Sequence, residues 1–276
     1  MTSDRTIDPS AFHDFEHVGW ERAAEHYART FGTLTVQATD PILDAVQITP
    51  GTQLLDVASG PGYVAAAAAL RGATVVGIDF SPAMVEDARR RHPYLVFEEG
   101  DAEALPFEAG RFDAVVMNFG LLHLARPDAA IHEAYRVLAQ GGRYAFTVWA
   151  SPDKAIGFGA VLRAMEAHGT TNVGLPDGPP FFRFSDVGES TRALTAAGFS
   201  NIVVRTLPLV WRLPSGDALF EAALHGGVRT SAALRAQTPQ ALAAIREAVL
   251  AEMRGYAVDD GIAVPMPVVL ASGMKR

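Results

Sequence analysis

The chain has 276 residues, of which 49% are hydrophobic and 20% charged, the balance of a globular protein with a substantial core. It has no cysteine, which excludes disulfides, thiolate metal sites and cysteine nucleophiles. A net charge of −8 and a pI near 5.5 argue against nonspecific affinity for nucleic acid.

The first 150 residues contain a regular alternation of predicted elements. Residues 1–50 are predicted to be mainly helical. Apolar, β-rich runs and the helical patterns between them predict strands at 53–58, 74–80, 94–101, 112–120 and 143–150, and helices at 63–72, 81–92 and 128–142. Ser81 as N-cap and Pro82 at the first helical position mark one helix start, and a Gly-Gly pair is expected to end the helix at 128–142. Strands that alternate with helices form parallel units, so we expect a sheet covered on both faces, with its ligand edge at the carboxyl ends of the strands.

The regular alternation of strands and helices ends near residue 150. In chain order the sequence predicts a helix at 153–169, a Gly/Pro-rich loop at 170–182, a helix at 185–199 with Ser185 as N-cap, β character at 201–213, mainly helix at 217–255 and a strand-like segment at 261–272. The loop is long for a simple connector, which favours a lid over a binding site.

The stretch "LLDVASGPGY" (54–63) brings an apolar strand to an aspartate and a glycine turn. Gly60 and Gly62 permit a tight turn that a ligand can approach closely. Asp79 ends the next strand and Asp101 follows the third, so carboxylates stand at successive strand ends. A dinucleotide would bring its pyrophosphate to the first turn, where Asp56 opposes that charge. S-adenosylmethionine has ribose and adenine but no phosphate and carries cationic groups, so carboxylates suit it better.

Two alternatives remain open from the residues. An NAD(P)-dependent oxidoreductase is possible because Gly60-x-Gly62-x-x-Ala65 satisfies the loose dinucleotide fingerprint. The other alternative is a non-catalytic module that keeps the S-adenosylmethionine pocket as a regulatory or structural site. A binding assay with S-adenosylmethionine and with NAD(P) distinguishes a methyltransferase from the oxidoreductase. Tight binding of S-adenosylmethionine without turnover would favour the non-catalytic module.

Four segments in a fixed order resemble a known family: "LLDVASGPG", "VVGIDFSPAMVEDAR", "EEGDAEALPFEAGRFDAVVMNFGLLHL" and "VLAQGGRYAFTVW". The order is similar to that of class I S-adenosylmethionine-dependent methyltransferases of the ubiquinone/menaquinone-biosynthesis group, over about residues 50–150. The resemblance implies an α/β, Rossmann-like fold with a mostly parallel seven-stranded sheet, its last strand antiparallel, helices on both faces and a helical lid. We expect a single domain over 1–276, with a helical cap at 1–50, a cofactor-binding core at 51–150, and lid helices and C-terminal strands at 151–276.

The resemblance also implies roles for individual residues, with S-adenosyl-L-methionine as cofactor. The residues expected at its methionine part are Asp56, Ser59, Gly60 and Gly62, with Tyr27 covering that end and Asn118 beneath the cofactor. Those expected at its nucleoside are Asp79 on the ribose hydroxyls, Phe80 and Met84 against the adenosine, Asp101 on the adenine amino group and Ala102 offering its backbone N–H to the ring.

Methyl transfer from a sulfonium is an in-line displacement that can rest on proximity and water exclusion, and it needs a base only when the acceptor is protonated. His123 is the titratable residue best placed to be that base, and the alternative reading is a packing or hydrogen-bonding histidine. An apolar acceptor pocket is expected from Trp149, Phe158, Phe181, Phe182, Trp211 and His225, with core packing as the alternative for each aromatic residue.

The expected partner is a small, flat, aromatic or apolar molecule methylated on O, C or N. No histidine pair has a metal-ligand spacing, so no metal is expected. The polar N-terminus lacks the apolar core of a signal peptide, and no apolar run reaches the roughly 18 residues that span a bilayer. We therefore expect a cytoplasmic protein, monomer or homodimer, that binds neither nucleic acid nor membrane.

Overall fold

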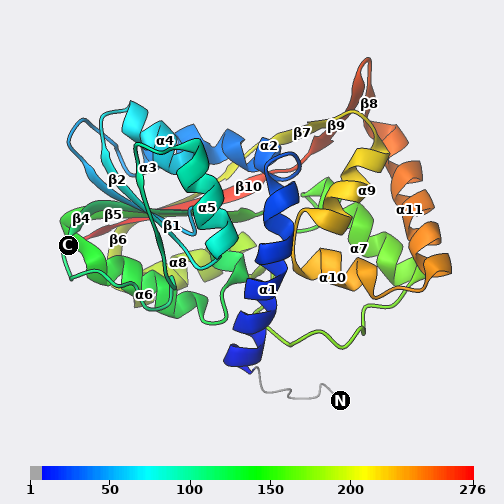
Figure 1. Cartoon of the computed structure of the whole chain (residues 1–276), viewed down its shortest axis with the longest axis horizontal. Coiled ribbons are helices and arrows are strands. Elements are labelled where there is room, and N and C mark those ends of the chain that lie inside the picture. The colour runs from blue at the N-terminus through cyan, green and yellow to red at the C-terminus, as the bar shows by residue number, and fades with distance from the viewer. Residues whose placement is uncertain (1–7) are drawn as a thin grey trace.

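The computed structural model describes residues 8–276, and its centre is a seven-stranded sheet (Figure 1). The strand order is β3-β2-β1-β4-β5-β10-β6. The strands are β1 Gln53–Val57, β2 Thr74–Asp79, β3 Val96–Glu99, β4 Phe112–Asn118, β5 Leu138–Trp149, β6 Phe199–Leu207 and β10 Val268–Lys275. Strands β1 to β5 pair in parallel, and β10 runs antiparallel to both β5 and β6. The expected mostly parallel sheet, with its last strand antiparallel, is confirmed.

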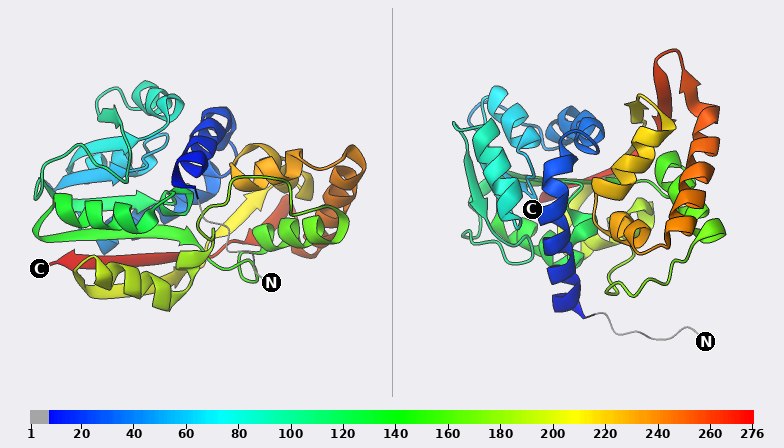
Figure 2. Two further views of the ribbon diagram at one scale, coloured as in Figure 1. Left: turned by 90° about the horizontal axis from the view of Figure 1, so that it is seen from below. Right: turned by 45° about the vertical axis from the view of Figure 1, so that its right-hand side comes forward.

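Helices cover both faces of this sheet (Figures 1 and 2). One face carries α3 Thr39–Ala45, α4 Tyr63–Leu70 and α5 Pro82–Arg91, and the other carries α6 Pro127–Val137 and α8 Val187–Ala196. The predicted start of α5 is confirmed, because Ser81 Oγ accepts the N–H of Met84 at 3.2 Å and Pro82 opens the first turn.

A second, mainly helical part lies beyond the carboxyl ends of the parallel strands, with α1 between the two parts (Figure 1). The helix between the two parts is α1 Pro9–Tyr27, and the helices of the second part are α2 Gly32–Thr35, α7 Ile156–His168, α9 Gly216–His225, α10 Arg229–Arg235 and α11 Pro239–Met253. A small antiparallel sheet of order β7-β9-β8 joins them, formed by Val210–Leu213, Gly261–Pro265 and Ala257–Val258. Of the helical segment predicted at 1–50, residues 1–7 lie outside the described residues.

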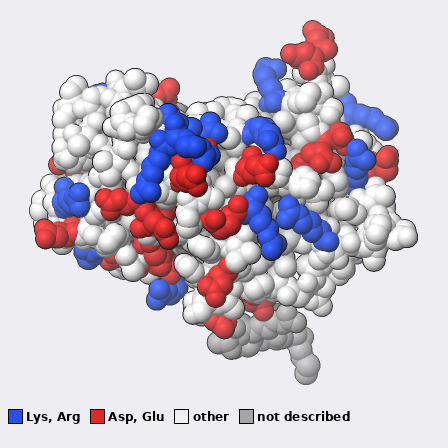
Figure 3. All heavy atoms as spheres, in the orientation of Figure 1, with Lys and Arg blue, Asp and Glu red and all other residues white. Residues whose placement is uncertain are grey.

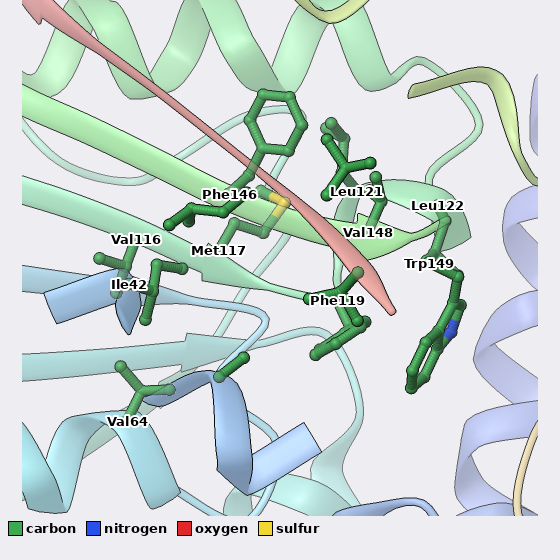
Figure 4. Packing of buried hydrophobic residues seen from close by; sticks show 14 of the residues in the cluster. Ile42, Val64, Val116, Met117, Phe119, Leu121, Leu122, Phe146, Val148 and Trp149 are labelled. Carbon is green, nitrogen blue, oxygen red and sulfur yellow. The ribbon is translucent and has the colours of Figure 1, made fainter. Parts of the chain in front are cut away.

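One continuous hydrophobic cluster connects the two parts. It runs from β1 and β4 through Phe119 and Trp149 into α7 and α9. Figure 4 shows Phe119, which follows β4, next to Trp149, the last residue of β5, and their ring centroids are 4.2 Å apart. Aromatic residues therefore continue the sheet's core into the wall of the second part.

Three predicted details of the elements are wrong. Helix α6 ends at Val137 rather than at the glycines, because Leu138 already pairs with Phe112 and the ladder then skips to Arg143 opposite Ala114. Ser185 closes a 3₁₀ turn, and Asp186 is the residue that caps α8 by accepting the N–H of Glu189.

The third correction concerns the segment at 261–272, which forms two strands in two different sheets. Proline residues at 265 and 267 lack the N–H that a continuous ladder requires, so β9 ends where the chain turns toward β10.

Candidate active site

A cavity of about 1120 Å³ of empty space, partly open to solvent, lies at the carboxyl ends of the neighbouring strands β1 and β4, where the connections that follow them leave toward opposite faces of the sheet. This is the switch point at which open α/β sheets bind ligands. Residues that end or follow each of β1 to β5 line it, and α1, α7 and α10 close it from the other side. The sequence-predicted residues that line it are Tyr27, Gly60, Asp79, Phe80, Met84, Asp101, Ala102, Asn118, His123, Trp149 and Phe158, together with Phe181.

The glycine turn presents Gly60 to this cavity. Gly60 has φ +50°, and a β-carbon there would meet no atom within 4 Å, so the backbone is open on that side. Its N–H donates to Oδ2 of Asp79 at 2.8 Å. The turn thus offers a ligand close approach while its amide is already bound by a carboxylate.

Asp79 stands at the end of β2 with its carboxyl in the cavity wall. Besides Gly60, the N–H of Ser81 donates to its Oδ1 at 3.0 Å. Burial raises the pKa of Asp79 to about 6, although both backbone N–H groups act to lower it. At neutral pH the carboxylate is therefore ionised, and each oxygen retains a lone pair for a donor on a ligand.

The far end of the cavity is formed by Phe80, Met84, Asp101 and Ala102 beneath helix α1. The ring of His13 lies edge-on to Phe80 with centroids 5.7 Å apart. Its Nε2 is 4.0 Å from Oδ2 of Asp101. Helix α1 thus covers the edge at which the sequence predicts the nucleoside.

Three residues predicted at the methionine part, Asp56, Gly62 and Ser59, lie next to the cavity but outside its lining. Oδ2 of Asp56 accepts the N–H of Ala65 at 3.0 Å, in the first turn of α4. The N-cap of α4 is Gly62, which has no side chain to cap the helix, so Asp56 does so from β1. A β-carbon on Gly62 would lie 2.6 Å from Cζ of Phe97, which places that glycine against β3.

The third of these residues, Ser59, is buried under the turn, and its Oγ has no hydrogen-bond partner among the described residues. Burial raises the pKa of Asp56 to about 8, opposed by the Ala65 N–H and increased by the charge of Asp79. Asp56 is thus protonated at neutral pH, and its role in the structure is to support the turn.

The acceptor side of the cavity is aromatic. Phe158 packs against Trp149 at 5.2 Å and against Phe31 at 5.7 Å between ring centroids. Phe181, from the predicted lid loop, closes the wall with centroids 5.9 Å from Phe158. These apolar surfaces suit a flat, apolar ligand.

Three residues predicted for this pocket lie outside its lining. Phe182 packs behind Phe181, with ring centroids 4.9 Å apart. Trp211 is on β7, tilted against Phe31 with ring centroids 4.8 Å apart, and its Nε1–H is donated to Thr33. His225 ends α9, with its Nε2 3.4 Å from the carboxylate of Glu221. In this structure Phe182 and Trp211 thus pack behind the rings that face the cavity, and His225 contacts Glu221 away from it.

Several lining residues were missed from the sequence, among them Trp20, Phe31, Phe119 and Arg229. Phe119 carried one usable signal, since it directly follows Asn118 at a strand end. It adopts φ +61°, and Ala58 at the end of β1 adopts φ +53°, which is unusual for residues other than glycine. Such strain often gathers at functional sites. The residues from α1 and α10 carry no sequence signal, because only the tertiary fold brings them here.

Asn118 and Tyr27 have their polar groups fixed by neighbours. Nδ2 of Asn118 donates to the carbonyl of Thr35 at 3.3 Å, and its Oδ1 accepts from Oγ1 of Thr147 at 2.6 Å. The Tyr27 hydroxyl is 2.9 Å from Oγ1 of Thr35. Burial raises the pKa of Tyr27 to about 12, so the hydroxyl stays protonated.

His123 lies in the 3₁₀ turn after β4 and lines the cavity. Its Nδ1 is 2.9 Å from Oε2 of Glu16 on α1, and its ring meets that of Trp20 edge-on at 4.8 Å. The ring therefore has a fixed orientation between α1 and the strand ends.

Two kinds of feature are absent from residues 8–276. No group of three or more His, Asp or Glu side chains in that range has the arrangement of a metal site. Within the same range, no helix has the length and apolar character to cross a membrane.

Comparison with known proteins places this site in a family. Residues 55–146 match the family model of a methyltransferase domain. The chain is 43% identical to the demethylmenaquinone methyltransferase of Beutenbergia cavernae over 110 residues, 40% of this chain and 46% of that protein. It thus aligns with about half the length of several such relatives, but with 69% of the demethylmenaquinone methyltransferase of Paenarthrobacter aurescens, at 31% identity over 60% of this chain.

Among solved structures, the fold is similar to phosphoethanolamine N-methyltransferase 2 of Haemonchus contortus in complex with phosphomonomethylethanolamine and S-adenosylhomocysteine. The TM-score is 0.60 at 19% identity, covering 96% of this chain and 60% of that one, which shows a shared fold. Together with the relatives above, these matches show that the chain belongs to the class I S-adenosylmethionine-dependent methyltransferases of the ubiquinone/menaquinone-biosynthesis group.

Proposed function

We propose that the protein transfers a methyl group from S-adenosylmethionine to oxygen or carbon, with nitrogen as the less suited alternative, of a small, flat hydroxyaromatic molecule. The observation that carries this proposal is one continuous cavity with two different ends. Carboxylates and a glycine turn form one end, and aromatic rings with His123 form the other.

The residues at the first end fit this cofactor. Asp79 has acceptor capacity for two ribose hydroxyls, and Asp101 is an acceptor for an adenine amino group. Among the described lining residues the only Arg or Lys is Arg229, at the opposite end and paired with Glu16. The cavity thus suits a nucleoside with cationic groups better than an anionic one.

The same geometry counts against a dinucleotide. Loops that hold a pyrophosphate direct free backbone N–H groups at it. Here the Gly60 N–H is donated to Asp79, whose carboxylate would repel a phosphate at that place. We therefore do not favour the oxidoreductase alternative.

The mechanism that this chain supports rests on position and exclusion of water. When bound, S-adenosylmethionine supplies an electrophilic methyl group on a sulfonium. The aromatic wall of Phe31, Trp149, Phe158 and Phe181 orients a flat acceptor and excludes water. His123 stands at this wall as the group that can accept a proton from the acceptor.

The acceptor class follows from the pocket and from the relatives. The named relatives are demethylmenaquinone methyltransferases. A reduced naphthoquinone, which is flat, apolar and bears weakly acidic hydroxyls, matches the aromatic wall and the histidine. We propose an acceptor of this kind, acted on in the cytoplasm and without nucleic acid. Lys/Arg and Asp/Glu side chains are interspersed on the face shown in Figure 3, without one large positive area.

The test is turnover with a labelled donor. We incubate the protein with S-adenosylmethionine that carries a deuterated methyl group and with naphthalene-1,4-diol kept reduced, and identify products by mass spectrometry. We expect a product one labelled methyl group heavier, and an Asp79→Ala variant should form it slowly at low donor concentration. Binding of S-adenosylhomocysteine without transfer to this or other hydroxyaromatic molecules would contradict catalysis and favour the binding module.

A further inference from the structure

Glu16 is a buried carboxylate in the middle of α1 that joins three segments distant in sequence. Its side chain is 0% exposed. Oε2 lies 2.9 Å from Nδ1 of His123, and Oε1 accepts from Nε of Arg229, the first residue of α10, at 2.8 Å. An ionised carboxylate is stable at such a depth only when charges and donors surround it, and Arg229 provides the compensating charge.

Arg229 is itself fixed in place. Its Nη1 donates to the carbonyl of Pro179 in the lid loop, and its Nη2 donates to the carbonyl of Leu122, each at 2.7 Å. A guanidinium has only donors, so its Nε–H can be satisfied at this place only by the oxygen of Glu16. Oε1 of Glu16 is thus committed to Arg229, and Oε2 faces the histidine.

This arrangement determines where neutral His123 carries its proton. A carboxylate only accepts hydrogen bonds, so Nδ1 must be the protonated nitrogen. Nε2 then keeps its lone pair, and it has no hydrogen-bond partner among residues 8–276. The ring lines the cavity, so the nitrogen left without a partner is the one that an acceptor can use.

We propose that Glu16, held by Arg229, is a positioning residue that fixes the tautomer of His123 and makes Nε2 the proton acceptor. This rests on the proposed function and adds to it the residues that make His123 a base toward the acidic hydroxyl of the acceptor. The O–H bond of the acceptor breaks as its proton passes to Nε2, and the electron pair left on the acceptor forms the bond to the methyl carbon while the carbon–sulfur pair stays on sulfur.

A consequence is that the tautomer of His123 is fixed only when α1 covers the cavity. Glu16 belongs to α1, Arg229 to α10 and His123 to the turn after β4, so displacement of α1 removes the carboxylate from the imidazole. Proton acceptance and closure over the acceptor are therefore coupled.

The substitution Glu16→Gln provides a sharp test because it keeps the shape but removes one acceptor. The amide oxygen must face Arg229, so the amide nitrogen faces His123 and donates to Nδ1. Neutral His123 then carries its proton on Nε2 and can no longer accept one from the cavity. The same logic explains why an amide in place of the carboxylate inactivates a Ser-His-Asp triad without disturbing its geometry.

The first experiment reads the tautomer directly. Long-range proton–nitrogen correlation spectra of the protein with S-adenosylhomocysteine show which ring nitrogen is protonated, and the His123→Gln spectrum assigns the signal. We expect Nδ1–H in the unmodified protein and Nε2–H in Glu16→Gln. The control is Glu25→Gln, an exposed carboxylate on the same helix, which should resemble the unmodified protein. Nε2–H in the unmodified protein, or Nδ1–H in a folded Glu16→Gln, would overturn the proposal.

The second experiment measures turnover of naphthalene-1,4-diol by the same variants. Glu16→Gln should lower kcat by about 10²-fold or more, with the KM for S-adenosylmethionine within about twofold of the unmodified protein. An unchanged kcat would refute the positioning role. Failure of the proposed function is distinguishable, because it would show as absent turnover in every variant while the spectra still report the tautomer. If Glu16→Gln does not fold, the spectrum of the unmodified protein decides.

Discussion

Two aspartates on neighbouring strands, Asp79 and Asp56, differ in the number of backbone N–H groups that they accept and in their position relative to the cavity. Asp79 on β2 is held by two backbone N–H groups at the cavity wall, whereas Asp56 on β1 receives only the N–H of Ala65 beneath α4. Burial raises the pKa of both, to about 6 and about 8. The side chain with more donors is the one that is ionised at neutral pH and suited to bind ligand.

The cofactor's affinity should therefore depend on Asp79 and on pH. Hydroxyl donors of a ribose bind the ionised carboxylate better, so affinity for S-adenosylhomocysteine should fall as the pH drops through about 6 and Asp79 becomes protonated. Titration calorimetry of the unmodified protein between about pH 7 and pH 5 measures the loss. Asp79→Asn should bind about tenfold or more weakly at neutral pH and show no such dependence. A flat profile in the unmodified protein would contradict this role.

The raised pKa of Asp56 should affect the stability of the folded protein and not the affinity for the cofactor. The pKa of about 8 in the folded protein exceeds the value of 3.8 that an aspartate has in water. The folded state thus binds more protons than the unfolded state between these values, and the contribution of Asp56 to stability decreases as pH rises through this range. Asp56→Asn mimics the protonated form and still offers a carbonyl to Ala65.

Urea unfolding at two pH values tests this linkage. The Asn variant should exceed the free energy of unfolding of the unmodified protein by a clearly larger amount near pH 8 than near pH 5, because the loss from Asp56 grows with pH between the two pKa values. A variant less stable by the same amount at both pH values would show that Asp56 is ionised in the folded protein.

At the scale of elements, helix α1 joins the two ends of the cavity. Oε1 of Glu21 accepts from Oγ of Ser81 at 2.5 Å and from the N–H of Ala83 at 3.2 Å, which attaches α1 to the start of α5. About one turn earlier, Glu16 attaches it to His123 and Arg229. The helix lies over the cavity as a cover that these side chains hold in place.

A ligand in the cavity should therefore slow exchange of the α1 amides. Hydrogen exchange measured with and without S-adenosylhomocysteine should show increased protection across Pro9–Tyr27, because opening of α1 would then expose the ligand. Helix α6, Pro127–Val137, packs on the sheet away from the cavity and is the internal control. Equal protection of α1 in both states would mean that α1 does not cover the ligand.

The elements of the core could be predicted from local patterns, whereas the cover could not. Strong apolar strands, the Ser81 cap and the glycine turn determine local geometry within about ten residues of sequence. The pairing of Glu16 with His123 joins residues 107 positions apart, and that with Arg229 joins residues 213 apart. No local pattern encodes such contacts, and a buried glutamate resembles any exposed helical glutamate in the sequence.

The whole molecule combines a nucleoside edge and an aromatic wall in one cavity. Helix α1, which covers the cavity, lies between the large sheet and the helical part of the molecule (Figure 1). The predicted pocket aromatics Phe182 and Trp211 illustrate what sequence leaves undetermined at this scale. Both side chains pack directly behind rings that line the cavity, Phe182 behind Phe181 and Trp211 behind Phe31. In the sequence a ring that lines the cavity looks the same as a ring behind it, and only the packing decides which one faces the ligand.

In the proposed function this cavity holds a nucleoside amino acid and not a dinucleotide. Parallel calorimetric titrations of the unmodified protein with S-adenosylhomocysteine and with NADH distinguish the two ligands. We expect one S-adenosylhomocysteine per chain and no heat of binding from NADH, since Asp79 occupies the Gly60 N–H and faces the place of a pyrophosphate. Saturable binding of NADH with none of S-adenosylhomocysteine would contradict the account.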